Sequence, residues 1–301
     1  MRSSAKKVHG LFTALLTPFD KHGRVDRDAL SSLVRFQIAH GANGIYPCGT
    51  TGLGPLLDVE ERKIVAETVI KEAGSKVPVV VQVGCADTRS SVELARHAEK
   101  AGAYAVASLT PFYYKPGDRA VAKHFERIAG SISIPLLAYN IPQFTGNNLQ
   151  PKAIAALARQ GTIAGVKDSS RDVLQLLDLL NSVPEEFIVM NGTEEYALYA
   201  MMMGGDGVVS GGANAYPEVF HSLVSAHGSG DLVAAASAQK GILAFREAVK
   251  EAPISSYYEI LRARGMDCGD PRLPFLPLLK EDRIRLLARL KALGVPTSPK
   301  E

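Results

Sequence analysis

The sequence predicts a (β/α)₈ barrel followed by a C-terminal helical extension. Short apolar runs recur eight times along the first three quarters of the chain. A segment with apolar residues at helical spacing follows each run, which gives strand–helix units of roughly 20 to 35 residues. Beyond residue 231 the pattern is helical only. Buried parallel strands that alternate with helices are the sequence form of such a barrel.

The expected strands are continuous apolar runs of the kind that is buried on both faces of a sheet. The first run stops before Pro18, because proline has no amide proton for a central ladder. Residues 78–84 form a β-branched run that is typical of a fully buried strand. The expected strands are residues 10–16, 43–48, 78–84, 104–109, 134–140, 162–166, 187–192 and 207–212.

The expected helices carry recognisable start signals. Asp58 and Glu61 form a capping-box pattern, and Ser90 and Glu93 repeat it before the next helix. Pro151 suits the first turn of a helix because that turn needs no amide donor. The expected helices are residues 30–40, 59–73, 90–102, 118–129, 151–159, 173–180, 194–203, 217–227, 232–251, 254–264 and 281–293.

A natural break follows the eighth strand–helix unit, at Gly228-Ser229-Gly230. We therefore expect a barrel domain over residues 1–228, which carries the catalytic site, and a C-terminal helical domain over residues 229–301. A chain of 301 residues is long enough for one large α/β barrel.

Composition excludes several classes of protein. With 46% hydrophobic and 22% charged residues, the chain has the make-up of a globular protein. A net charge of +3, with no basic run interleaved with aromatics, argues against a nucleic-acid partner. No apolar stretch approaches the ~18 residues that a membrane span needs, so we expect no membrane partner.

The cysteines and the start of the chain indicate a cytoplasmic protein. Cys48, Cys85 and Cys268 are scattered, odd in number and without CxxC spacing, which favours reduced thiols. Residues 1–7 are basic, but the apolar stretch over residues 8–12 is too short for a secretion signal. We expect residues 1–7 to form a frayed tail.

Lys167 is the residue around which a site is expected. It stands at the carboxyl end of the sixth strand, where active sites of these barrels lie. A charged lysine is costly to bury in an apolar cavity, so burial favours the neutral amine that attacks a carbonyl carbon. A lysine that is solvated, or paired with Asp168, is the plainer alternative.

Other strand ends supply groups that fit imine chemistry. Tyr139 ends the fifth strand and, held by a threonine hydroxyl, suits proton transfer. Gly49-Thr50-Thr51-Gly52 follows the second strand and precedes a helix, so its amides suit a carboxylate such as that of pyruvate. Tyr139 is also compatible with a satisfied structural hydroxyl, and the glycine-rich stretch with a plain turn.

Two further groups have open interpretations. Glu194 and Glu195 suit either solvated acids in a first helical turn or contacts with a substrate. The seven histidines show no HxxxH or HExxH spacing, and none falls at a predicted carboxyl strand end, so we expect no metal and no cofactor other than the lysine imine.

Three motifs in this order resemble the dihydrodipicolinate synthase / N-acetylneuraminate lyase family. They are Gly49-Thr50-Thr51-Gly52, Tyr139-Asn140-Ile141-Pro142 and Gly165-Val166-Lys167-Asp168. The stretches 14–19 and 110–114 match as well, and the resemblance runs from about residue 9 to the C-terminal helices. It implies a class I pyruvate-dependent aldolase, a lyase that uses no metal and forms a homotetramer.

The resemblance also implies roles for single residues. Lys167 is the expected Schiff-base lysine, and Tyr139 the proton shuttle. Thr50 and Thr51 are expected to hold hydroxyl and carboxylate groups, and Tyr113 to reach into the site of a neighbouring subunit. The remaining expected substrate-binding residues are Gly49, Phe144, Ser169, Gly192, Glu194, Glu195 and Gly211.

Two departures from the family pattern bear on the substrate. Phe144 stands where the synthase subgroup has an arginine that binds the carboxylate of the aldehyde. Leu53 stands where an acidic residue is usual, so residues 49–55 (GTTGLGP) look like the 2-keto-3-deoxygluconate aldolase subgroup. Residues 191–195, with the YNIP motif, look partly like the neuraminate lyases.

These features predict an aldolase that reversibly cleaves a 2-keto-3-deoxy sugar acid to pyruvate and an aldehyde. The alternatives are a 4-hydroxy-tetrahydrodipicolinate synthase, which condenses pyruvate with aspartate semialdehyde, and an N-acetylneuraminate lyase. A binding or regulatory protein on the same scaffold stays open too, because fold does not fix function.

Overall fold

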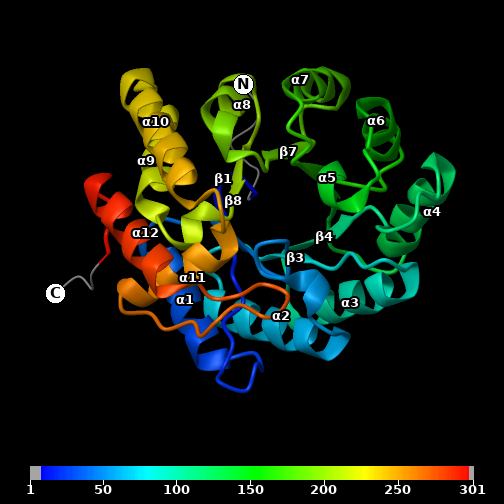
Figure 1. The fold of residues 1–301 in the computed structure, drawn as a ribbon. Helices are drawn as coiled ribbons and strands as arrows, with labels where there is room; N and C mark the ends of the chain where they lie inside the picture. Colours follow the sequence, from blue (N-terminus) through cyan, green and yellow to red (C-terminus); the bar gives the residue numbers. More distant parts are fainter. Residues whose placement is uncertain (1–7, 298–301) are drawn as a thin grey trace.

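The computed structural model describes residues 8–297 and shows a barrel of parallel strands inside a ring of helices (Figure 1). Within those residues the sheet has eight strands in the order β2-β1-β8-β7-β6-β5-β4-β3. A parallel bridge between Ile45 and Val79 joins the two ends of this order. The strands are β1 Gly10–Ala14, β2 Gly44–Tyr46, β3 Val80–Gln82, β4 Ala105–Leu109, β5 Leu136–Asn140, β6 Gly165–Asp168, β7 Ile188–Asn191 and β8 Gly207–Ser210. The predicted fold class is therefore confirmed.

The helices follow the strands in the expected alternation. Each predicted strand and helix has a counterpart near its expected place. The α-helices are α1 Arg27–Ala39, α2 Val59–Ala73, α3 Thr88–Ala101, α4 Asp118–Ala129, α5 Pro142–Thr145, α6 Pro151–Arg159, α7 Val173–Ser182, α8 Ala197–Met202, α9 Pro217–Ser229, α10 Leu232–Val249, α11 Pro253–Ala263 and α12 Lys280–Ala292. Short 3₁₀ turns are η1 Gly54–Leu56, η2 Glu194–Tyr196 and η3 Gly212–Asn214.

Two helix starts show how local chemistry decides a boundary. The capping box at Asp58 and Glu61 is present as predicted, with both reciprocal hydrogen bonds. The capping box predicted at Ser90 is wrong, because Asp87 caps α3 and its carboxylate accepts from the Ser90 amide. An aspartate at the N-cap satisfies an amide that the helix itself leaves free.

Two helical segments also differ from expectation. The helix expected over residues 194–203 is divided into η2 and α8. The one-turn helix α5 was not expected, since four residues are too few to show a period.

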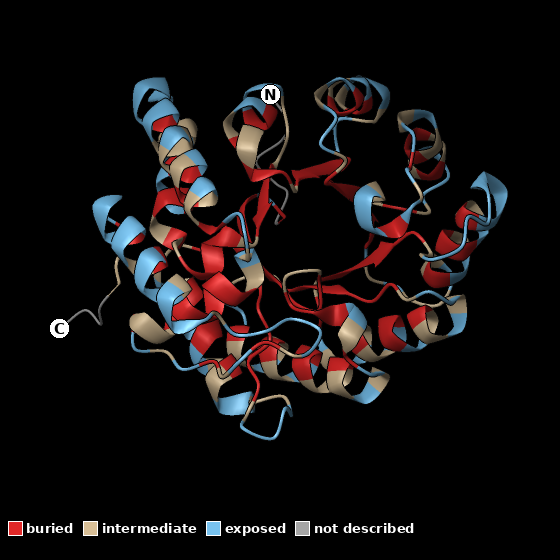
Figure 2. Cartoon of the chain, viewed as in Figure 1, coloured by how far each residue is buried: buried red, intermediate tan, exposed pale blue. Residues whose placement is uncertain are grey.

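Side chains alternate along each strand between the barrel interior and the helices outside. The interior cluster contains Phe12, Tyr46, Tyr139 and Met190, while a larger cluster lies between strands and helices. Figure 2 shows the strands as buried throughout and the helices as exposed on their outer faces. The barrel interior is thus filled by apolar and aromatic side chains.

The C-terminal helices pack against the barrel instead of extending away from it. α10 lies beside α9 (Figure 1), and the Tyr258 hydroxyl donates to the Thr17 carbonyl at 2.6 Å. The Arg272 guanidinium donates to both carboxylate oxygens of Glu61 at 2.6 Å. The division at residue 228 stays a prediction, and the tail expected over residues 1–7 lies outside the described residues. Among the described helices none is long and apolar enough to cross a membrane.

Candidate active site

Lys167 lies at the end of β6 with its side chain inside the barrel. It is 4% exposed, and its Nζ lies 4.0 Å from the centroid of the Tyr139 ring. The two residues are register partners on β5 and β6, so their side chains point to the same face of the sheet. Nζ also lies 4.6 Å from the centroid of the Tyr46 ring. The amine is therefore placed between two aromatic rings in the barrel interior.

Asp168 is not the ionic partner of Lys167. Consecutive strand residues point to opposite faces, so Asp168 lies on the outer side of the sheet. Its carboxylate accepts from Ser170 Oγ at 2.7 Å and from Asn140 Nδ2 at 2.9 Å. Burial raises the pKa of Asp168, and those two hydrogen bonds oppose the shift. No ion pair in the described residues joins Asp168 to Lys167.

The Tyr139 hydroxyl is held as the sequence predicts. It lies 3.2 Å from Thr50 Oγ1, which comes from the loop after β2. That loop is tightly folded. A Cβ on Gly54 would lie 1.9 Å from the Cys48 carbonyl oxygen, and a Cβ on Gly52 would lie 2.5 Å from the Leu15 carbonyl oxygen. The glycines therefore let the loop close over the strand ends and bring Thr50 to Tyr139.

Gly192 and Gly211 leave space beside the other site residues. A Cβ on Gly192 would lie 2.0 Å from Ser169 Oγ and 3.0 Å from Lys167 Cε. A Cβ on Gly211 would lie 2.6 Å from Thr51 Oγ1. The structure thus brings Lys167, Ser169 and Gly192 together, and places Thr51 against Gly211.

Glu194 is neither solvated nor free. It is 3% exposed, and its carboxylate accepts from the Ser210 hydroxyl at 2.7 Å and the Gly212 amide at 2.8 Å. Arg246 of α10 contacts Glu194 at 2.8 Å and Glu195 at 2.7 Å. The two carboxylates raise the pKa of the Arg246 guanidinium, against the opposing effect of its burial. The C-terminal helices therefore hold the loop after β7 in place.

Tyr113 and Phe144 lie at the surface of the single chain. Tyr113 is 86% exposed and has a left-handed backbone with φ of 76°, and its ring meets Tyr114 edge-on at 5.0 Å. Phe144 on α5 is 69% exposed. The neighbouring Gln143 Nε2 donates to the Ser169 carbonyl at 3.1 Å, which fixes α5 beside the end of β6.

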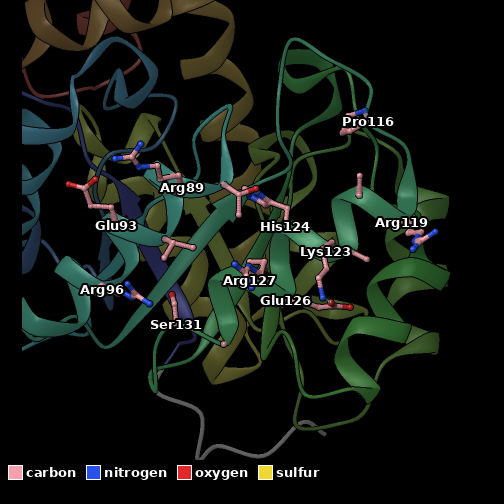
Figure 3. A pocket seen from close by; sticks show the side chains of 15 residues that line it. Arg89, Glu93, Arg96, Pro116, Arg119, Lys123, His124, Glu126, Arg127 and Ser131 are labelled. Carbon is pink, nitrogen blue, oxygen red and sulfur yellow. Dashed lines mark hydrogen bonds and ion pairs between the residues drawn. The ribbon is translucent and has the colours of Figure 1, made fainter.

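A separate groove of about 1760 Å³ lies outside the barrel between α3 and α4 (Figure 3). Cationic side chains line it, among them Arg89, Arg96, Arg119 and Arg127. His124 reaches from this wall into the protein, with Nδ1 3.0 Å from Thr88 Oγ1 and Nε2 3.2 Å from Ser108 Oγ. Burial lowers the pKa of His124 to about 4. No predicted site residue lines the groove.

Two residues near the site were missed by the sequence reasoning. Tyr46 looks like one more aromatic residue in a strand, although it stands directly before the glycine-rich loop. Arg246 acts through Glu194, 52 residues earlier in the chain, and spacing does not reveal that contact. No cluster of three or more His, Cys, Asp or Glu side chains suited to a metal occurs in residues 8–297.

Comparison with known proteins places these features in a family. The model of the dihydrodipicolinate synthetase family matches residues 7–293. A 4-hydroxy-tetrahydrodipicolinate synthase from Chlorobium limicola is 40% identical over 295 residues, which is 97% of this chain and 99% of the relative. A dihydrodipicolinate synthase from Bacillus anthracis superposes with a TM-score of 0.90 at 28% identity, covering 94% of this chain and 98% of the other. A catalytic-lysine mutant of the Ruminococcus gnavus sialic acid aldolase gives a TM-score of 0.93 at 27% identity, covering 98% of both chains.

Proposed function

This chain belongs to the dihydrodipicolinate synthetase family, whose members are lyases, and we propose that it joins pyruvate to an aldehyde, or reverses that reaction, through an imine on Lys167. One observation carries the proposal. The buried Lys167 amine lies 4.0 Å from the ring of Tyr139, whose hydroxyl is 3.2 Å from Thr50. A nucleophile beside a positioned proton carrier is the arrangement that covalent catalysis needs.

The reaction follows from these groups. The neutral Lys167 amine attacks the keto carbon of pyruvate, and loss of water gives a protonated imine. The imine draws electrons from the neighbouring C–H bond, so that the proton leaves and an enamine forms. The enamine carbon then attacks the aldehyde carbon, and the resulting alkoxide takes a proton from Tyr139, which Thr50 positions. Hydrolysis of the imine releases the product and restores the amine.

The relatives favour the synthase alternative over the sugar-acid cleavage that the sequence predicts. The compared synthases match nearly the full chain, and they are named as 4-hydroxy-tetrahydrodipicolinate and dihydrodipicolinate synthases. We therefore take 4-hydroxy-tetrahydrodipicolinate synthase as the first candidate.

One residue favours a second candidate. Phe144 offers a ring where the synthase subgroup has a carboxylate-binding arginine. An aromatic side chain supplies no charge for a carboxylate, whereas it packs well against an uncharged aldehyde. Cleavage of a 2-keto-3-deoxy sugar acid thus stays the second candidate.

We also propose a homotetramer in the cytoplasm, acting without a metal. An exposed aromatic pair on a strained loop, Tyr113 and Tyr114, suits contact with a second copy, in which Tyr113 reaches the neighbouring site. The described cysteines are free, which suits a reducing compartment.

Borohydride trapping with pyruvate tests the proposal. We expect the intact protein to gain one reduced pyruvyl group, located on Lys167 by peptide mapping, and the Lys167→Ala variant to gain none while keeping its circular dichroism spectrum. An unmodified wild-type protein would refute the imine. Turnover with aspartate semialdehyde, glyceraldehyde and N-acetylmannosamine then separates the candidates, because only the synthase prefers the semialdehyde.

A further inference from the structure

Tyr46 is a buried aromatic residue of the site for which no role has been assigned. It ends β2 and is 1% exposed. Its ring meets the Tyr139 ring edge-on, with centroids 6.0 Å apart and planes at 82°. Lys167 Nζ lies over both rings, 4.6 Å from the centroid of Tyr46 and 4.0 Å from that of Tyr139.

The hydroxyl of Tyr46 has no hydrogen-bond partner in the described residues, although it is fully buried. Burial, with Tyr139 beside it, raises the pKa of Tyr46 well above its usual value, so the hydroxyl keeps its proton and is a donor. A buried donor without a partner destabilises a protein, and phenylalanine would fill nearly the same space without that cost. The hydroxyl is therefore available to donate to a ligand that enters the barrel.

The ring has a separate use. Aromatic faces attract a cation placed within about 6 Å of the centroid, and more strongly where water is excluded. The imine of Lys167 is reactive in its protonated, cationic form. Neighbouring acids do not supply the counter-charge here, since Asp168 lies on the outer face of β6 and Glu194 is bound by Arg246. The groups that lie next to the Lys167 amine are instead the rings of Tyr46 and Tyr139.

We propose that Tyr46 is a substrate-contacting residue, whose ring stabilises the protonated imine on Lys167 and whose hydroxyl donates a hydrogen bond to the bound pyruvyl group. The inference rests on the proposed function, because it requires an imine. Tyr46 neither forms nor breaks a covalent bond. Its ring stabilises the positive charge of the imine, and its hydroxyl donates to an oxygen of the pyruvyl adduct.

Two variants separate the roles of the hydroxyl and the ring. Tyr46→Phe keeps the ring, and Tyr46→Leu removes both groups. Phe12→Leu is the matched control, because Phe12 is equally buried in the same interior cluster but has no contact with Lys167 among the described interactions. The measurement is the pyruvate concentration that gives half-maximal borohydride trapping, recorded with the melting temperature of each variant.

We expect this concentration to rise about tenfold in Tyr46→Phe, as for the loss of one hydrogen bond. In Tyr46→Leu we expect a further rise of about tenfold, as for the loss of a desolvated cation–π contact. Phe12→Leu should lower the melting temperature and leave the trapping midpoint within about twofold of wild type.

Two results would overturn the inference while the wild type is trapped normally. One is a wild-type midpoint in Tyr46→Phe together with a midpoint in Tyr46→Leu no higher than in Phe12→Leu. The other is a fall in the melting temperature of Tyr46→Phe that is large enough for loss of structure alone to explain its higher trapping midpoint. Failure of the proposed function looks different, because the wild-type protein itself would then not be trapped.

Discussion

The hydroxyl oxygens of Thr50 and Tyr139 lie 3.2 Å apart, although 89 residues separate them in the chain. Removing the phenol oxygen in Tyr139→Phe takes away the proton carrier and leaves the amine of Lys167 in place. We expect kcat to fall by roughly 10²- to 10⁴-fold, the usual contribution of a positioned acid or base. Steady-state turnover measures this, and borohydride trapping should still modify Lys167.

Tyr199→Phe is the control for that experiment, because Tyr199 lies on α8 and is 38% exposed. It should keep the wild-type rate. A Tyr139→Phe enzyme with more than a tenth of the wild-type kcat would show that the proton comes from elsewhere.

Phe144→Arg tests which aldehyde the surface near β6 accepts. An arginine at this position supplies a charged, bidentate donor for a carboxylate. We expect kcat/KM to rise about tenfold or more for aspartate semialdehyde and to fall for glyceraldehyde. Equal ratios for the two aldehydes before and after the change would mean that residue 144 does not contact the acceptor.

Gly192→Ala tests the space beside the reactive amine. The added Cβ would lie 2.0 Å from Ser169 Oγ and 3.0 Å from Lys167 Cε, so one of these side chains must move. Because a displacement of about 1 Å at a reacting group lowers rates by about 10²-fold, we expect that loss in the rate of imine formation. Gly228→Ala, where nothing lies within 4 Å of the new Cβ, should leave the rate unchanged. Rapid-quench trapping follows both variants.

Arg246→Leu tests the support beneath the loop after β7. It leaves the carboxylate of Glu194 buried without its cation, and breaking a buried ion pair in this way costs about 3 kcal/mol. Glu194→Gln removes the charge but keeps a side chain that accepts from Ser210, so it should cost less. Urea unfolding measures the free energies. A raised KM for the aldehyde in Glu194→Gln without loss of stability would instead indicate a direct substrate contact.

We expect the buried His124 to lower the free energy of unfolding in acid. Its pKa is about 4 in the folded chain against 6.5 for the ordinary side chain, because burial disfavours the charged ring. Between pH 6.5 and pH 4 the His124 ring binds a proton in the unfolded chain but stays neutral in the folded chain. The free energy of unfolding therefore falls as the pH falls through this range, and it levels off below pH 4. The loss from this group is about 3 kcal/mol over that interval.

Urea unfolding at several pH values measures this dependence, and the His124→Gln variant isolates it. The variant lacks the ring that lies in the wall of the outer groove (Figure 3) and should lose about 3 kcal/mol of the difference between pH 7 and pH 4. Identical slopes in both proteins would show that other groups cause the dependence.

The fold was readable from the sequence because most strands and helices carry the residue pattern typical of their type. Parallel strands buried on both faces have continuous apolar runs, and α2 carries its own capping box. The start of α3 was not readable in this way. Asp87 stands three residues before Ser90, and either side chain can cap a helix, so the pattern alone does not decide between them. α5 is a single turn and has no period to detect.

The centre of the site was readable for a different reason, since Lys167 and Tyr139 stand at strand ends in register. What stayed hidden depends on distant partners. Arg246 meets Glu194 across 52 residues, and only the packing of α10 beside the barrel determines that contact. Tyr46 was hidden because an aromatic residue in a strand usually fills a core, and its unpartnered hydroxyl is visible only in three dimensions.

The pairing of β1 with β8 also bears on how the protein is made. Gly10 pairs with Gly207, and the Asn214 side chain bonds the backbone at Ala14 and Leu16. During synthesis β8 therefore leaves the ribosome some two hundred residues after β1, and β1 cannot pair with it before then. Until then the growing sheet has two unpaired edges, which are sites for aggregation. Closing β8 against β1 removes both edges in one step, and that step comes only after most of the chain has been made.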